Sequence, residues 1–153
     1  MDFKDHAIKG LKNVTNLLTK DLEALPEEAF EKHFGGKART VADIIYEVNA
    51  VSDHLGMLVR GEKTPEDSEG WITAPPDFRG KQKVIAAFQE TTNNLIQTFE
   101  GFTQEQLLEP VETERGPTTR YQRCLFAAIH IWYHTGQVNY VQTLLGDDAW
   151  HWK

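Results

Sequence analysis

Apolar residues recur every three or four positions along most of this chain, which is the period of an amphipathic α-helix. No stretch alternates apolar and polar residues over more than a few positions, so no β-strand is predicted. Four long helical stripes, together with the absence of strands, predict an all-α chain that closes as a four-helix bundle. The predicted helices cover residues 3–24, 40–60, 81–100 and 119–145.

Local signals predict several helix ends. Thr40 is a predicted N-cap with Asp43 three residues later, a relative of the capping box, and Gly61 ends the same helix. Residues 26–36 begin with Pro-Glu-Glu and end with Gly-Gly, which predicts a short helix. Residues 103–106 carry a Thr/Gln capping pair that predicts one further short turn.

Residues 61–80 form the one long predicted loop. This segment holds three glycines and three prolines and shows no sustained period. Long loops in compact domains are often functional or act as lids. Trp71 and Ile72 are expected to hold the loop against the bundle.

The length and charge of the chain narrow the class of protein. Its 153 residues predict a single domain over 1–153. The 16 Lys and Arg against 23 Asp and Glu give a formal net charge of −7, which disfavours binding to nucleic acid or to an anionic membrane. The sequence predicts neither a membrane span nor a signal peptide, and Cys124 is the one cysteine, so a cytoplasmic location is predicted.

The last predicted helix carries the most informative residues. Its segment 124–133 is apolar on every side, which predicts burial on nearly every side, and His130 is its one strongly polar member. His134 follows one turn later on the same face, and two imidazoles at this spacing can bind one metal ion. The alternative is a pair of histidines each satisfied by a hydrogen bond at the edge of the core. Cys124 is predicted to be a small core residue rather than a nucleophile.

A third ligand should come from another helix, and the second predicted helix offers Glu47 and His54 at the margin of its apolar stripe. A carboxylate there would complete a Glu-His-His set with open positions, which is typical of catalytic coordination. The alternative for Glu47 is a solvated glutamate beside Arg39 or Lys37. The alternative for His54 is an ordinary half-exposed histidine.

Two segments of the chain resemble the DinB/YfiT-like superfamily. They are His130–Val138, which reads His-x-x-x-His-x-Gly-Gln, and Arg39–Val48 on the second predicted helix. The resemblance implies a bundle of up-down-down-up connectivity and a divalent metal, zinc or nickel first and iron next. One residue of the second helix and the two histidines of the last helix would hold that metal. It also implies a homodimer and, among characterised relatives, thiol-dependent S-transferases and a maleylpyruvate isomerase.

The chain departs from this pattern in one position, because the superfamily usually has histidine where Glu47 stands. We take Glu47 with His130 and His134 as the ligand set and keep His54 as the second choice, since using His54 disturbs the match over residues 40–45. A glutamate adds negative charge and raises the basicity of a bound water. The identity of the metal, the thiol-transfer activity and whether the site is active or degenerate therefore stay open.

Three further features of the C-terminal region prompt expectations. Gly136 is expected to allow close packing against another helix. Gln137 is read either as a group that supports the metal or as a plain surface side chain. The tail Trp150-His151-Trp152 is expected to pack across the end of the bundle or on a dimer partner.

Two functions follow as hypotheses. The first is a metal-dependent enzyme, either an S-transferase that uses a low-molecular-weight thiol or a hydrolase, acting on a small electrophile. The second is a non-catalytic protein that binds a metal or small molecule in stress responses, or a dimeric interaction module. Neither includes a nucleic acid or a membrane as a partner.

Overall fold

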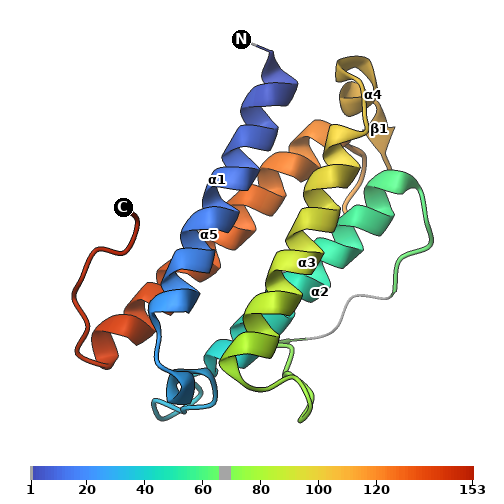
Figure 1. Cartoon of the computed structure of the whole chain (residues 1–153). Coiled ribbons are helices and arrows are strands. Elements are labelled where there is room, and N and C mark those ends of the chain that lie inside the picture. The colour runs from blue at the N-terminus through green and yellow to red at the C-terminus, as the bar shows by residue number, and fades with distance from the viewer. Residues whose placement is uncertain (1, 66–69) are drawn as a thin grey trace.

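The computed structural model describes residues 2–65 and 70–153, and its four long helices form a bundle (Figure 1). This confirms the predicted all-α fold, and each long helix lies within about one residue of its predicted range. The long helices are α1 Phe3–Ala24, α2 Val41–Arg60, α3 Lys81–Glu100 and α5 Arg120–Leu144. The short elements are the 3₁₀ turn η1 Glu27–Phe30, α4 Gln104–Leu108, and the strands β1 Pro110–Val111 and β2 Thr118–Thr119.

The connectivity of the bundle is up-down-down-up (Figure 1). α2 and α3 run in the same direction, opposite to α1 and α5. α1 packs against α3 and α5, and α2 packs against the same two helices, so α1 and α2 face each other across a diagonal. This arrangement places α2 directly beside α5, although α3 and α4 separate them in sequence.

The core lies where the four apolar stripes meet. Its largest fully buried side chains include Leu11 and Leu18 from α1, Ile45 from α2, Phe88 from α3 and Ile131 from α5. Each such side chain contributes roughly 1.5–3 kcal/mol through burial. The core therefore draws on all four long helices, and its formation fixes their relative positions.

The helix ends follow the local signals closely. Thr40 and Asp43 form a reciprocal capping box, and Gly61 ends α2 in the left-handed conformation with φ of 75°. The prediction of a short helix over 26–36 is wrong in extent, because the structure has only the 3₁₀ turn Glu27–Phe30 in this segment. The prediction of no strand is also corrected by the antiparallel pair β1–β2, whose two-residue strands are too short for alternation to reveal them.

The predicted loop over 61–80 is held by Trp71, whose ring packs on the Arg39 guanidinium, and by residues that were not expected. Residues 66–69 lie outside the described part of the chain. Ala74 and Phe78 are buried, whereas Trp71 is 65% exposed. The Ala74 backbone N–H donates to Asp43 Oδ1 at 2.9 Å. The hydropathy pattern cannot reveal a backbone hydrogen bond of this kind, which is why this second anchor of the loop was not predicted.

The expectation that segment 124–133 is buried on nearly every side is wrong. Cys124 and Ile131 lie in the core, but Ile129 is 66% exposed and Tyr133 is 54% exposed. α5 packs mainly against α1 and α2, so apolar residues on the opposite side of the helix stay exposed to solvent. Burial raises the pKa of the Cys124 thiol to about 12, in keeping with a core residue rather than a nucleophile.

The C-terminal tail packs on its own bundle. Trp152 donates from Nε1 to Asp21 Oδ1 at 2.8 Å, and its ring lies 5.3 Å from that of Trp132. His151 contacts Asp147, with 2.9 Å between Nε2 and Oδ2. Asp21 belongs to α1 and Trp132 to α5, so the tail lies along these two helices. No helix in the described part of the chain is long and apolar enough to cross a membrane.

Candidate metal centre

Glu47, His130 and His134 converge between α2 and α5. The Nε2 atoms of the two histidines are 3.2 Å apart. Glu47 Oε1 lies 3.6 Å from His134 Nε2 and 3.9 Å from His130 Nε2. The structure therefore brings together the three residues that were predicted as a set.

The fold produces this convergence in simple steps. His130 and His134 are one turn apart on α5, so their rings leave the helix on the same face. Glu47 lies on the side of α2 that meets α5, next to the fully buried Val48. His134 is fully buried, while the side chains of His130 and Glu47 are 14% and 15% exposed. The cluster is thus closed on the His134 side and reachable from the side of His130 and Glu47.

Gln137 determines which nitrogen of His134 carries the hydrogen. Its Oε1 accepts from Arg39 Nη2 at 3.2 Å, and its Nε2 donates to the Tyr133 hydroxyl at 3.1 Å. The same Oε1 lies 2.8 Å from His134 Nδ1, which must therefore be the donor. With the hydrogen on Nδ1, the Nε2 lone pair of His134 points toward Glu47 and His130, as metal ligation requires.

Arg39 holds the other side of the cluster. Its Nη1 donates to Glu47 Oε2 in an ion pair, which leaves Oε1 facing the histidines. The guanidinium lies over the ring of Trp71, 4.3 Å from the ring centroid. A glutamate beside Arg39 was the alternative considered for Glu47. In the structure the carboxylate pairs with Arg39 through Oε2 and faces the two histidines through Oε1.

Both imidazoles are held in their neutral form. Burial lowers the pKa of His130 to about 4, assisted by His134 and opposed by the charge of Glu47. Burial also lowers the pKa of His134, against the effect of its hydrogen bond with Gln137. Neutral imidazole is the form that binds metal ions, so the two histidines are available as ligands at neutral pH.

The donor set fits a divalent metal. The three distances between Glu47 Oε1 and the two Nε2 atoms define a triangle whose centre lies about 2.1 Å from each corner. Zinc is bound by histidine nitrogen and carboxylate oxygen at ~2.0–2.2 Å, and two histidines with one glutamate form a known catalytic set. Three protein donors leave further coordination positions for other molecules.

The second-choice ligand does not join this cluster. Glu47, His130 and His134 form the one group of three or more potential ligands found among residues 2–65 and 70–153, and His54 is outside it. Sequence reasoning considered Arg39 beside Glu47 only as the alternative to a metal site, and it missed Tyr133 as the partner of Gln137. Tyr133 lies four residues before Gln137 on one helix, a spacing that could have suggested the contact.

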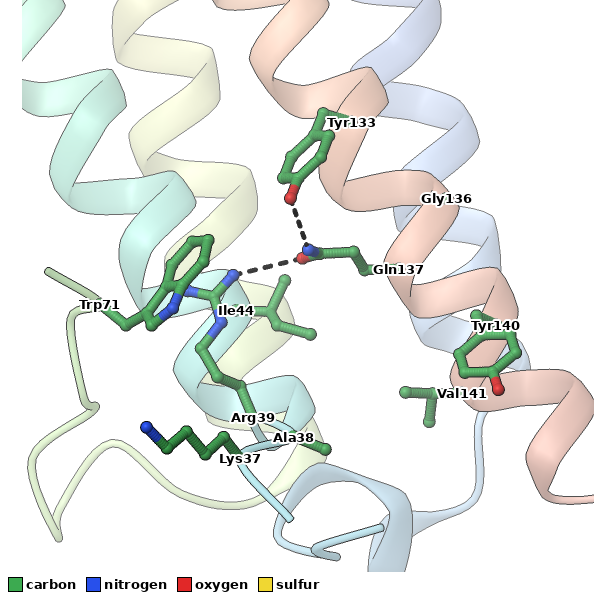
Figure 2. A pocket seen from close by; sticks show the side chains of 10 residues that line it. All are labelled: Lys37, Ala38, Arg39, Ile44, Trp71, Tyr133, Gly136, Gln137, Tyr140 and Val141. Atoms are coloured by element: carbon green, nitrogen blue, oxygen red, sulfur yellow. Dashed lines mark hydrogen bonds between the residues drawn. The ribbon is translucent and has the colours of Figure 1, made fainter. Parts of the chain in front are cut away.

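Gly136 does not pack against another helix as expected. A Cβ atom built at this position meets no other atom within 4 Å. Its outer surface instead forms part of the wall of a cavity beside the cluster (Figure 2). The expectation failed because a glycine within a helix does not by itself indicate a close neighbour. At Gly136 the glycine borders open space.

The fold and the site together define a four-helix bundle whose second and last long helices carry a candidate metal centre. A family model described as the DinB superfamily matches residues 10–138, and the chain belongs to this superfamily. The crystal structure of a conserved protein from Enterococcus faecalis is similar to this fold with a TM-score of 0.75 at 14% identity. That match covers 96% of this chain and 99% of the other. No curated protein matches the chain.

Proposed function

We propose that Glu47, His130 and His134 bind a divalent metal ion and that the protein is a metal-dependent enzyme acting on a small electrophile. The observation that carries the proposal is the convergence of one carboxylate oxygen and two imidazole nitrogens around a common point. When bound, such an ion acts as a Lewis acid and lowers the pKa of a coordinated water or thiol.

The residues of the chain itself would perform the positioning. Gln137 keeps His134 in the tautomer that presents Nε2, and Arg39 keeps Glu47 turned toward the histidines. The complete burial of His134 excludes water from the inner side of the cluster. A nucleophile would approach from the partly exposed side of His130 and Glu47.

The nucleophile we propose is a low-molecular-weight thiol, for an S-transferase, or water, for a hydrolase. Imidazole and carboxylate ligands suit zinc and nickel, which we propose first, and also iron. We place the proposed enzyme in the cytoplasm, because the reducing environment there keeps thiols in their reduced form.

The ion pair between Arg39 and Glu47 favours a second candidate function. A carboxylate already neutralised by a guanidinium attracts a cation less strongly, which suits a protein that binds a metal or small molecule without turnover. The stress-response binding protein and the dimeric interaction module belong to this alternative.

Metal content of the full chain tests the proposed centre. We expect close to one equivalent of zinc, nickel or iron by elemental mass spectrometry, and its loss in Glu47→Ala and His134→Ala. His33→Ala is the matched control, because His33 is exposed and outside the cluster. A wild-type protein that stays metal-free after loading with all three ions would overturn the centre. Metal retained in Glu47→Ala would overturn the choice of Glu47.

Turnover separates the two candidate functions. The metal-loaded protein is assayed for thiol transfer to small electrophiles and for hydrolysis, with chelator-treated protein alongside. Turnover that disappears with the metal supports the enzyme. A melting temperature that falls on chelation, with no turnover of any substrate, supports the non-catalytic alternative.

A further inference from the structure

A cavity of about 530 Å³ opens beside the candidate metal centre (Figure 2). The segment before α2 and the loop residue Trp71 form one wall, and α5 forms the other. Ile44 and Val141 supply apolar surface between these walls. The volume is in the range of cavities that take small molecules, ~300–1,000 Å³.

Aromatic rings line both walls. Trp71 lies on one side, and Tyr133 and Tyr140 lie on the other (Figure 2). Trp71 and Tyr140 are each 65% exposed although they border a cavity. Exposed aromatic rings around a concave surface present flat apolar area to a ligand, and they favour a flat apolar body over a flexible polar one.

The charged residues that line the cavity are positive, although the net charge of the chain is −7. Lys37 and Arg39 both border the cavity, and none of the described residues that line it carries a carboxylate. Arg39 already binds Glu47 and Gln137 through its two terminal nitrogens. Lys37 makes no ion pair with any residue in the described part of the chain. One cation without an ion-pair partner among the described residues suits a ligand with a single negative charge.

The cavity and the cluster share two residues. Arg39 and Gln137 line the cavity, and they also hold Glu47 and His134 through hydrogen bonds. A molecule seated in the cavity would therefore lie next to the groups that position the candidate ligands.

We propose that this cavity binds a small, flat, apolar monocarboxylate, with its carboxylate at Lys37 and its body between the stacked pair Trp71–Arg39 and the two tyrosines. Its assignment as the substrate class rests on the proposed function, since only a competent metal centre would act on it. The binding itself needs no metal, which allows the two proposals to be tested separately.

The test compares 2-naphthoate with its uncharged isostere 2-naphthamide by isothermal titration calorimetry on chelator-treated full-length protein. We expect the acid to bind about fivefold more tightly, the effect of one partly exposed ion pair. Lys37→Met should abolish this preference and leave the affinity for the amide unchanged. Lys9→Met is the matched control, because Lys9 is exposed on α1 and remote from the cavity lining.

A second variant tests the location of the ligand. Gly136→Leu directs a side chain into the open space at Gly136 and removes a flexible residue from the helix, so the fold should be retained. We expect binding of 2-naphthoate to be lost while the metal content stays at the wild-type level. Binding unchanged in this variant, equal affinities for acid and amide, or no binding at all would each overturn the proposal. Binding of 2-naphthoate by a protein that takes up no metal would overturn only the proposed centre.

Discussion

At the scale of single residues, Gln137 accepts two hydrogen bonds on one oxygen, from the guanidinium of Arg39 and from the imidazole of His134. Its Oε1 is 3.2 Å from Arg39 Nη2 and 2.8 Å from His134 Nδ1. A hydrogen bond to the second nitrogen of a metal-binding histidine fixes the orientation of the ring. Its loss lowers metal affinity by roughly 10–100-fold. Gln137 therefore connects the two halves of the candidate centre.

Replacing Gln137 tests this role. Gln137→Leu removes the acceptor of the His134 Nδ1 hydrogen, and we expect zinc affinity to fall by about 10–100-fold. Gln137→Glu keeps an acceptor and should retain most of the affinity. Competition with a chromophoric chelator measures both, and Gln97→Leu on the exposed side of α3 serves as the control. Equal affinity in the wild type and Gln137→Leu would contradict the role.

Asp43 links the start of α2 to the loop that follows the helix. Burial alone would raise the pKa of Asp43, but hydrogen bonds from Thr40 and the Ala74 N–H, with the charge of Arg79, hold it below its usual value. The ionised carboxylate therefore stabilises the fold above its ordinary pKa of about 4. This contribution is lost as the pH falls through the lowered folded-state value.

Asp43→Ala should therefore reduce the free energy of unfolding by about 1–3 kcal/mol at pH 7. The difference from the wild type should shrink in strong acid, where the carboxyl group of the wild type is protonated as well. Urea unfolding at pH 7 and near pH 2 measures both values. The same difference at the two pH values would show that the charge of Asp43 does not contribute.

At the scale of elements, α5 combines a buried face with an outer face that borders the cavity, and Gly136 lies on the outer face. Because a Cβ atom at Gly136 meets nothing within 4 Å, a small side chain there encounters no neighbour. The glycine therefore costs helix stability without a packing benefit that offsets it.

Gly136→Ala should raise the free energy of unfolding by about 0.5–1 kcal/mol, the difference in helix propensity. Gly10→Ala on α1 is a matched comparison, since Gly10 is also helical, exposed and next to open space. Thermal unfolding followed by circular dichroism measures both. A lower melting temperature for Gly136→Ala alone would mean that this glycine serves close packing after all.

The elements that the sequence predicted well are those with local signals. Thr40 and Gly61 mark the ends of α2 because capping and left-handed backbone depend on nearby residues alone. The histidine pair on α5 was likewise visible from its spacing. The contact between Arg39 and Gln137 joins residues 98 positions apart, and only the tertiary fold creates it. The exposure of Ile129 is also tertiary, since it depends on which helices surround α5.

At the scale of the whole molecule, the outer face of α5 leaves apolar side chains uncovered. Those that lie outside the cavity lining follow one another at helical spacing and are Phe126, Ile129 and Trp132. Contiguous apolar surface of this kind marks interaction sites. We propose that a second copy of the chain covers it, as in the homodimer expected from the sequence.

Light scattering after size-exclusion chromatography should give the mass of a dimer for the wild type. Ile129→Asp places a charge in the centre of the stripe, and we expect a monomer with an intact helical spectrum. Leu108→Asp is the control, because Leu108 is 55% exposed on α4 and outside the stripe. A monomeric wild type at high protein concentration would rule out this dimer.

The separation of α2 from α5 along the chain has a consequence for synthesis. Glu47 leaves the ribosome 83 residues before His130, which at ~5–20 residues per second is roughly 4–17 s. During that interval the carboxylate has Arg39 within reach but neither imidazole. Any ion that enters the cluster therefore does so once nearly the whole chain has emerged and α5 has docked. The ion that is taken up would then depend on the metal ions available to the finished chain and not on those present during its synthesis.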